Sequence, residues 1–391
     1  MRTCRRCLYP ENHPLGITFD KEGICSGCRI HEEKYALDWD ARFEKLKKLT
    51  DAFRDRSGLG YDCIVPYAGT GDAYFTLHVV VKRLGLNPLV VRYNPHYNSH
   101  VGNRNYAYLK TLFDVDVFDQ VVQPQKVKKI TKATLKRLAS IHWHVVAGHT
   151  VFPVQVAVRM KIPLIIWSMH QGMEQVGMFS HTDEVEMTRK YRKEHDLMGM
   201  EAEDLVDIEG LTEQDLMPFF YPRSREIERV GVRGIYLNNF IPWDSKAQHE
   251  EMIRLYGFET SEQPRTFDTY NTIGMLHYAD LHDEIKQRKC GYGFATDHAV
   301  REIRWGRITK EEGAALAAYY HRRPLRYLAA MENWLDMSKE EIFHYLPPQK
   351  KKNASPAEVE SILRKLGFVL TPPRCDRKEK DFILWEKGYV N

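Results

Sequence analysis

Four cysteines near the start of the chain form two Cys-x-x-Cys units, Cys4 with Cys7 and Cys25 with Cys28. Each unit directs two thiolates toward one point, and the seventeen residues between the units are enough for a hairpin that brings the pairs together. Four thiolates complete a tetrahedral zinc site without an open position, so we expect a structural zinc ribbon. A redox dithiol and replacement of one ligand by His31 are the alternatives, but the spacing of both units favours four cysteine ligands.

A loop of small residues follows the first strand-like segment, residues 61–67, and precedes a helix expected over 73–84. Small residues let the backbone approach a ligand, and the N–H groups at the start of a helix attract an anion. The loop consists of Ala68, Gly69, Thr70, Gly71, Asp72 and Ala73. Its spacing matches neither the Walker nor the dinucleotide-binding pattern, so the loop by itself fits a phosphate cradle and an unliganded turn equally well.

Polar residues also stand near other expected element ends. Arg92 and Asn94 close the second strand, at the edge of a parallel sheet where ligands gather. His144 belongs to a histidine cluster that precedes a helix expected over 153–160. This histidine is a candidate for a substrate site, with a role in packing as the alternative.

A charged segment later in the chain opens a helix and contains Asp297, Arg301 and Arg304. Arginines at a spacing of three, including Arg307, share one helix face and can bind a diphosphate in a bidentate way. A solvated helix face accounts for the same pattern. These residues are therefore candidates for substrate binding.

Strands alternate with helices through residues 58–245, which predicts an α/β fold with a parallel, doubly wound sheet. The expected strands cover 61–67, 89–93, 116–118, 164–167 and 234–237. The expected helices cover 73–84, 100–113 and 153–160. This region is the domain that must position the small-residue loop.

Two further regions flank the α/β domain. The ribbon is assigned to residues 1–32, and a helical pattern over 31–56 places a linking helix at 33–57. Strand signals fade after Trp243, so residues 246–391 are expected to be a helical C-terminal region. Its clearest helical patterns cover 310–320 and 356–366.

Composition limits the possible functions. The 391 residues carry a formal net charge of +4, which gives no indication of nucleic-acid binding. An export signal is not visible, and the apolar run at 162–167 is far too short for a membrane span, so a cytoplasmic location is expected. Cys63, Cys290 and Cys375 are scattered and are read as small thiols rather than nucleophiles.

Several segments taken in order resemble the N-acetyl sugar amidotransferase family of bacterial surface-polysaccharide (LPS) synthesis. The two cysteine pairs come first, followed by Gly16-Ile17-Thr18-Phe19-Asp20 and Gly85-Leu86-Asn87-Pro88-Leu89-Val90-Val91. Further along are Lys161-Ile162-Pro163-Leu164-Ile165-Ile166-Trp167, Gly291-Tyr292-Gly293-Phe294-Ala295-Thr296-Asp297-His298 and Arg301-Glu302-Ile303-Arg304-Trp305-Gly306-Arg307. Together they span most of the chain.

This family looks like a branch of the ATP pyrophosphatase (PP-loop) superfamily, whose sheet is of the adenine-nucleotide alpha hydrolase type. The resemblance implies that residues 68–73, with Arg92 and Asn94, bind ATP with Mg²⁺ and that Asp72 is catalytic. It also implies adenylation of an acetamido group on a nucleotide-linked sugar, with ammonia from a separate glutaminase giving an acetamidino group. The candidate sugar-binding residues are then His144, Asp297, Arg301 and Arg304.

The loop departs from the Ser-Gly-Gly-x-Asp-Ser pattern of that superfamily. Ala68 and Ala73 replace serines and Thr70 replaces a glycine, which removes two hydroxyl donors and places a Cβ where a positive φ would be strained. An acidic residue is also missing directly after Trp167.

The alternatives are an impaired or non-catalytic homologue that serves as a scaffold for a glutaminase, and a tRNA-modifying PP-loop enzyme. The tRNA alternative requires catalytic cysteines in the α/β domain, where only Cys63 occurs.

Overall fold

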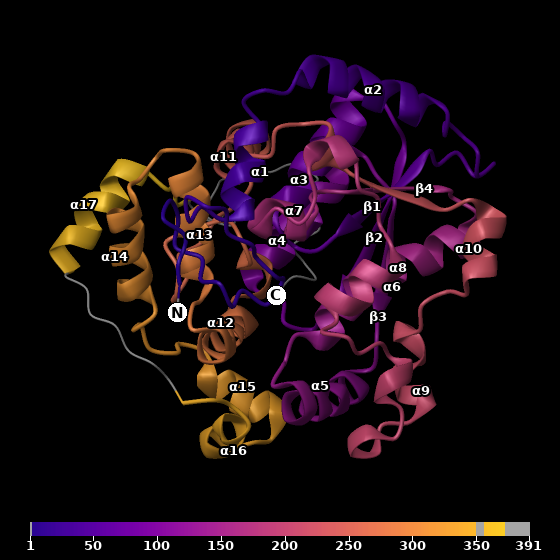
Figure 1. Cartoon of the computed structure of the whole chain (residues 1–391). Coiled ribbons are helices and arrows are strands. Elements are labelled where there is room, and N and C mark those ends of the chain that lie inside the picture. Colours follow the sequence, from indigo (N-terminus) through magenta and orange to yellow (C-terminus); the bar gives the residue numbers. More distant parts are fainter. Residues whose placement is uncertain (1, 349–355, 372–391) are drawn as a thin grey trace, which may run out of the picture. The chain divides into compact units, whose positions relative to one another are not determined.

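The structure is a computed structural model in which residues 2–348 and 356–371 are described (Figure 1). The basic run at 350–352 and Cys375 lie outside these residues. The described chain divides into two compact units. Unit 1 contains residues 2–37, 170–184 and most of 260–370, whereas unit 2 contains residues 38–169 and 185–259. Unit 1 therefore combines the ribbon with the described part of residues 260–370 of the helical C-terminal region, whereas residues 246–259 of that region belong to unit 2.

Unit 2 is built around a parallel sheet of five strands among the described residues, in the order β3-β2-β1-β4-β5. The strands are β1 (Cys63–Tyr67), β2 (Pro88–Asn94), β3 (Val117–Val121), β4 (Leu164–Trp167) and β5 (Arg233–Tyr236). The central strand β1 pairs with β2 from Cys63↔Pro88 to Tyr67↔Arg92, and with β4 at Ile64↔Ile165. Since β2 and β4 lie on opposite sides of β1, the strand order reverses at the carboxyl end of β1. That reversal is where open α/β sheets bind ligands.

The helices of unit 2 connect these strands (Figure 1). The longer ones are α2 (Trp39–Asp51), α4 (His100–Phe113), α5 (Pro124–Leu138), α6 (Trp143–Met160), α10 (Ser224–Val230) and α11 (Ser245–Tyr256). The shorter ones are α3 (Gly71–Leu77), which continues as the wider turn η1 (His78–Arg83), α8 (Arg189–Tyr191) and α9 (Glu213–Leu216). The apolar face of α6 covers the sheet, where Val151, Val154 and Ile165 pack in one buried cluster.

The predicted parallel, doubly wound α/β fold is confirmed, and so is the helical C-terminal region. The helix expected over 31–56 is wrong, because the chain breaks into α1 and α2 and Asp38 caps the second helix by accepting a hydrogen bond from the Ala41 N–H.

The helix expected over 153–160 begins earlier, at Trp143, so His144 lies within α6 rather than ahead of a helix. Pro153 stands inside α6 and removes a single backbone donor, while the buried apolar residues on both sides keep the helix continuous.

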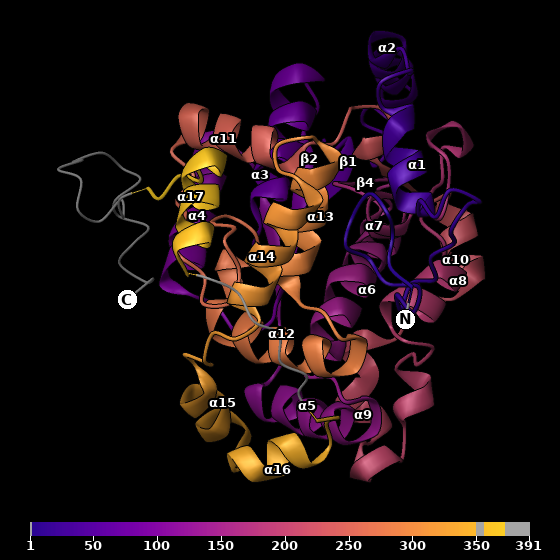
Figure 2. The same cartoon turned by 60° about the vertical axis from the view of Figure 1, so that its left-hand side comes forward.

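Unit 1 combines the ribbon with helices from three stretches of the chain. The ribbon ends in α1 (Ser26–Glu33), and α7 (Gln171–Val176) packs against it. The remaining helices are α12 (Leu276–Cys290), α13 (Phe294–Arg304), α14 (Lys310–Tyr320), α15 (Leu328–Leu335), α16 (Lys339–His344) and α17 (Pro356–Leu366). Helices α13, α14 and α17 lie side by side (Figure 2). Within the described residues, no helix is long and apolar enough to cross a membrane.

Candidate functional site

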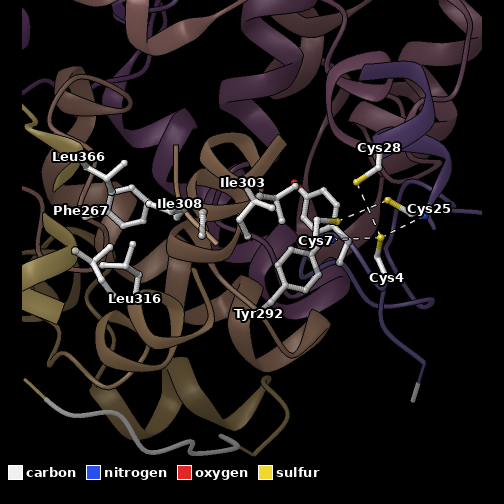
Figure 3. Packing of buried hydrophobic residues seen from close by; sticks show 14 of the residues in the cluster. Cys4, Cys7, Cys25, Cys28, Phe267, Tyr292, Ile303, Ile308, Leu316 and Leu366 are labelled. Atoms are coloured by element: carbon white, nitrogen blue, oxygen red, sulfur yellow. Dashed lines mark hydrogen bonds between the residues drawn. The ribbon is translucent and has the colours of Figure 1, made fainter. Parts of the chain in front are cut away.

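The four predicted zinc ligands meet in unit 1. Their sulfur atoms all lie within 4.8 Å of one another, with Cys7 Sγ 3.7 Å from Cys25 Sγ and Cys4 Sγ 4.0 Å from Cys28 Sγ (Figure 3). In a tetrahedral zinc site with Zn–S bonds of about 2.3 Å, the sulfurs stand about 3.8 Å apart. The sulfur cluster therefore has the dimensions of a four-thiolate metal centre.

Short loops of the ribbon hold these sulfurs in place. The first pair sits in a turn where the backbone N–H groups of Arg6 and Cys7 both donate to Cys4 Sγ, and the second pair opens α1. Cys25 N–H also donates to Cys4 Sγ, at 3.3 Å. His31, the alternative ligand, packs edge-on against the Trp305 ring instead. The four candidate ligands are thus all cysteines, and backbone hydrogen bonds position their sulfurs.

The chemistry of the cluster suits a metal. Hydrogen bonding from Cys25 lowers the pKa of Cys4, and hydrogen bonding from Cys28 lowers the pKa of Cys25 to about 6, whereas hydrogen bonds with Cys25 raise the pKa values of Cys7 and Cys28. Metal binding requires thiolates. All four cysteines are buried in the apolar cluster of unit 1, together with Tyr292, Ile303 and other side chains of α13 and α14 (Figure 3). This burial excludes solvent from the sulfurs.

The small-residue loop of unit 2 leaves the carboxyl end of β1 at the reversal of strand order. Its positive φ falls on Gly69, at +78°, whereas Thr70 has an extended φ of −108°. The threonine in place of the superfamily glycine is therefore unstrained. Its side chain makes no capping hydrogen bond with α3, which leaves the hydroxyl available to a ligand.

The members of this loop differ in exposure. Ala68, Gly69, Thr70 and Asp72 are partly exposed, whereas Gly71 and Ala73 are buried. Asp72 stands in the first turn of α3. The open side of the loop is thus formed by four of its six residues.

His249 is a neighbour of this loop that the sequence analysis missed. It lies on α11, is fully buried, and places Nε2 3.4 Å from the Asp72 carboxylate. A Cβ on Gly71 would collide with the His249 ring, so the glycine is what allows this approach. Neither periodicity nor a local motif links α11 to the loop, because the contact arises only from packing of α3 against α11.

A second contact connects the loop region to β4. The hydroxyl groups of Thr76 on α3 and of Ser168 are hydrogen-bonded to each other at 2.8 Å. Ser168 directly follows the last residue of β4. Ser168 stands where the family resemblance leads us to expect an acidic residue. A hydroxyl thus lies at this sheet edge.

Arg92 and Asn94 lie at the end of β2, as expected, and both are engaged within unit 2. Arg92 pairs with Asp119 at 2.9 Å, donates to Asn98 Oδ1, and covers the face of the Tyr106 ring at 4.2 Å. Asn94 accepts hydrogen bonds from the N–H of His96 and from the Asn98 side chain.

His144 lies in the interior of unit 2. Its Nδ1 is 3.0 Å from the Tyr93 hydroxyl and its Nε2 is 3.1 Å from the Tyr97 hydroxyl. Burial lowers the pKa of His144 to about 3, so the ring is neutral at neutral pH. This environment matches the packing alternative considered from the sequence.

Asp297 and Arg301 lie on α13 and are ion-paired within unit 1. Asp297 pairs with Lys286 and accepts a hydrogen bond from the Tyr9 hydroxyl at 2.9 Å. Arg301 bridges the buried carboxylates of Asp268 and Glu302, at 2.9 and 2.7 Å.

Arg304 also lies on α13, and its guanidinium reaches the ribbon. It donates to the carbonyls of Glu174 and Gln175 at 2.7 and 2.8 Å and lies 3.8 Å from Cys25 Sγ. Burial works against the charge of Arg304, but the sulfurs of Cys28 and Cys7 outweigh it, so the pKa of the guanidinium stays above its usual value.

The prediction that Arg301, Arg304 and Arg307 share one helix face is wrong for Arg307. Helix α13 ends at Arg304, and Gly306 adopts a φ of +69°, which turns the chain before Arg307. Arg307 instead pairs with Glu302 at 2.9 Å. Arg301 and Arg307 therefore share Glu302 as a partner, whereas Arg304 contacts the ribbon and α7, so the three side chains do not form one binding surface.

Comparisons with known proteins address the C-terminal part of the chain. Residues 264–366 match the family model described as "LPS biosynthesis protein WbpG-like, C-terminal domain". A comparison with curated proteins gave no match. The solved structure of NMN synthetase from Francisella tularensis aligns with 58% of this chain and 99% of its own at 13% identity, with a TM-score of 0.29.

The matched residues include helices α12 to α17 and two of the segments that carry the resemblance to surface-polysaccharide enzymes, those around Asp297 and Arg301. The match supports the LPS-biosynthesis part of the resemblance: residues 264–366 are similar to the C-terminal domain of the WbpG-like proteins.

Proposed function

We propose that this protein is an ATP-dependent amidotransferase that converts an acetamido group of a nucleotide-linked sugar into an acetamidino group for LPS O-antigen or a related surface glycan. The observation that carries the proposal is the loop at residues 68–73, at the strand reversal of a parallel sheet, in a chain with a WbpG-like domain. The loop supports ATP binding, and the domain supports a surface-glycan substrate.

The proposed reaction has two steps. The acetamido oxygen attacks the α-phosphorus of ATP, which releases pyrophosphate and leaves an adenylated imidate. Ammonia then adds to the imidate carbon, and AMP leaves with the former amide oxygen. An amide oxygen is a poor leaving group, so adenylation is what makes the substitution possible.

The loop would bind ATP mainly through its backbone. The positive φ at Gly69 and the small neighbouring residues leave room for phosphate oxygens, and the N-terminal end of the α3–η1 segment favours negative charge. Thr70 supplies one hydroxyl in place of the two serines that are missing. Each lost hydrogen bond to phosphate weakens binding by about 0.5–3 kcal/mol.

Asp72 is the proposed catalytic residue of the loop. Its carboxylate is a suitable oxygen ligand for the Mg²⁺ that accompanies ATP. His249 Nε2 lies 3.4 Å from this carboxylate, on its buried side. The proposed ATP site therefore consists of the partly exposed loop residues, including Asp72, with the buried His249 next to Asp72.

The remaining parts of the proposal follow the sequence analysis. The four-cysteine cluster binds a structural zinc ion, and a separate glutaminase supplies ammonia. His144, Asp297, Arg301 and Arg304 stay predictions for sugar binding. Asp297 and Arg301 already form ion pairs, so a sugar nucleotide bound there would have to replace Lys286 or Asp268 as their partner.

The test is an assay with the purified full chain, ATP, Mg²⁺, ammonia and UDP-linked acetamido sugars, including UDP-N-acetylglucosamine. Release of AMP and pyrophosphate, with a product one mass unit lighter by mass spectrometry, supports the proposal. The Asp72→Asn variant should release neither. The Asp51→Asn variant on α2 is the matched control, since its carboxylate pairs with Arg54 at the surface.

Two outcomes favour the alternatives. If the chain is inactive but the triple variant Ala68→Ser, Thr70→Gly, Ala73→Ser is active, the protein is an impaired homologue or scaffold. Tight, salt-dependent binding of tRNA instead favours the tRNA-modifying alternative. The burial of Cys63 in β1 counts against that alternative, because its thiol is not accessible to carry sulfur.

A further inference from the structure

The segment from the end of α13 to the start of α14 supplies two cations to the ribbon. Arg304 lies 3.8 Å from Cys25 Sγ through its Nη2 atom. Lys310 donates through Nζ to the carbonyl of Cys4 at 2.6 Å and to that of Arg5 at 3.4 Å. Both side chains thus reach the turns that carry the metal ligands.

A divalent ion bound by four thiolates carries a net charge of −2. All four sulfurs are buried among apolar side chains, where an uncompensated charge is costly. One arginine and one lysine carry a charge of +2. The positive charge that α13 and α14 bring to the ribbon is therefore equal in magnitude to the negative charge of the metal-loaded centre.

Other cations near the ribbon are engaged with carboxylates. Arg6 pairs with Glu32, Arg29 pairs with Asp20 and Glu22, and Lys34 pairs with Glu174. Arg304, in contrast, donates to two backbone carbonyls, lies near a cysteine sulfur and faces the Tyr9 ring at 5.5 Å. The positive charge of Arg304 can therefore compensate the negative charge of the sulfur cluster.

The local geometry is arranged around this guanidinium. Gly27 lies between the cysteines of the second pair, and a Cβ there would collide with Arg304 Nη2 and with the Gln175 carbonyl. Lys310 is the first residue of α14, where the helix dipole disfavours a cation. Its contact with the Cys4 carbonyl accounts for a lysine at this unfavourable position.

We propose that Arg304 and Lys310 neutralise the metal–tetrathiolate centre, so that the ribbon packs on α13 and α14 fully only when the metal is bound. Arg304 is then a positioning residue of the metal centre, which is an alternative to its predicted role in sugar binding. The inference rests on the zinc ribbon and is independent of the proposed amidotransferase activity.

The experiment compares zinc binding by the full-length wild type, Arg304→Gln and Arg304→Lys, in competition with a chromophoric chelator. Loss of a group around the metal ligands typically lowers metal affinity by about 10–100-fold, which is the expected effect of Arg304→Gln. Arg304→Lys should recover part of the affinity because it keeps the charge. The Co²⁺-loaded forms should show the same tetrathiolate absorption bands if the ligand set is unchanged.

The matched control is Arg29→Gln, which removes a charge from the ribbon but affects partly exposed pairs with Asp20 and Glu22. Its zinc affinity should equal that of the wild type. A second readout is hydrogen exchange at residues 294–304 and 310–320. Exchange there should rise when zinc is removed from the wild type, and should already be raised in zinc-loaded Arg304→Gln.

Further variants keep the proposal testable if Arg304→Gln does not fold. Gly27→Ala keeps the charge but displaces the guanidinium, and Lys310→Met removes the second cation. Both should also weaken zinc binding. Wild-type zinc affinity in every folded variant overturns the proposal, and so does a wild type that binds no zinc. Weaker binding of UDP-N-acetylglucosamine by Arg304→Gln, with unchanged zinc affinity, would instead assign Arg304 to the sugar.

Discussion

Gly71 and His249 show how one missing side chain can define the neighbourhood of a candidate catalytic residue. The His249 ring fills the space that a Cβ on Gly71 would need, and this brings Nε2 to 3.4 Å from the Asp72 carboxylate. A glycine is therefore needed at position 71 because the His249 ring packs against it, and not because its backbone has an unusual φ. Gly69, in the same loop, serves the backbone through its positive φ.

We expect Gly71→Ala to destabilise the protein by about 1–3 kcal/mol, as overpacking of a filled interior does, and to abolish ATP binding by displacing His249 from Asp72. Chemical unfolding and ATP titration measure the two effects. In the double variant with His249→Ala, the added methyl group has space, so the two changes should be less than additive. Strict additivity would show that the collision does not occur.

His144 makes a prediction about acid stability. Its pKa is about 3 in the folded protein because of burial, against a usual value of 6.5. Above pH 6.5 the residue is neutral in both states, but between pH 6.5 and 3 the unfolded chain binds a proton that the folded chain excludes. This buried histidine should therefore lower stability by up to about 1.4 kcal/mol for each pH unit in that window.

The corresponding measurement is the unfolding free energy between pH 7 and 4.5 for the wild type and for His144→Phe. The variant should lose stability less steeply as the pH falls, whatever its stability at pH 7. Equal slopes would mean that His144 takes up its proton in the folded protein.

Among elements, those with both a hydrophobic pattern and end signals were predicted to the residue. The helices over 100–113, 310–320 and 356–366 and the strand over 164–167 coincide with α4, α14, α17 and β4. Helix α4 begins at a serine cap, and α14 at a capping box of Thr309 and Glu312. Local chemistry was sufficient in these cases.

Other elements depended on tertiary packing and were misjudged. Pro153 suggested a helix start, but burial of the residues before it extends α6 back to Trp143. At the candidate site, the cysteine cluster followed from spacing, since each pair lies in one turn. The approach of His249 to Asp72, and of Arg304 to Cys25, joins residues that are distant in the sequence, and a single sequence carries no signal for such contacts.

The cap of α4 can be tested separately. Ser99 accepts a hydrogen bond from the Gly102 N–H at 3.0 Å, so Ser99→Ala should cost about 0.5–2 kcal/mol in the stability of α4. Hydrogen exchange at the first-turn amides measures this locally. Ser99→Asn keeps a side-chain acceptor and should stay near the wild type; equal loss in both variants would point to packing of the buried serine instead.

At the scale of the whole molecule, the four-cysteine cluster and the sheet belong to different units. The cysteines share an apolar cluster with Val300, Ile303 and Ile308, whereas the sheet of unit 2 has a separate cluster around Ile64 and Ile165. A structural metal contributes its binding energy to the unit that contains its ligands. Loss of the metal should therefore affect the two units unequally.

We expect a chelator to raise hydrogen exchange in the ribbon, α13 and α14 while the amides of β1, β2 and β4 stay protected. Restoring zinc should reverse the change. Uniform loss of protection would indicate that both units unfold together without the metal. A pattern confined to residues 2–33 would indicate that the ribbon alone depends on the metal.

The cysteines of the ribbon are translated well before the helices that cover them. Cys25 and Arg304 are separated by 279 positions, so the ribosome makes the cysteines long before the helix that packs on them. At about 5–20 residues per second, this delay is roughly 14–56 s. During that interval the nascent thiols lack the apolar cover of α13 and α14. Early capture of a metal ion would protect them from oxidation, so the supply of zinc during translation should influence the yield of correctly folded protein.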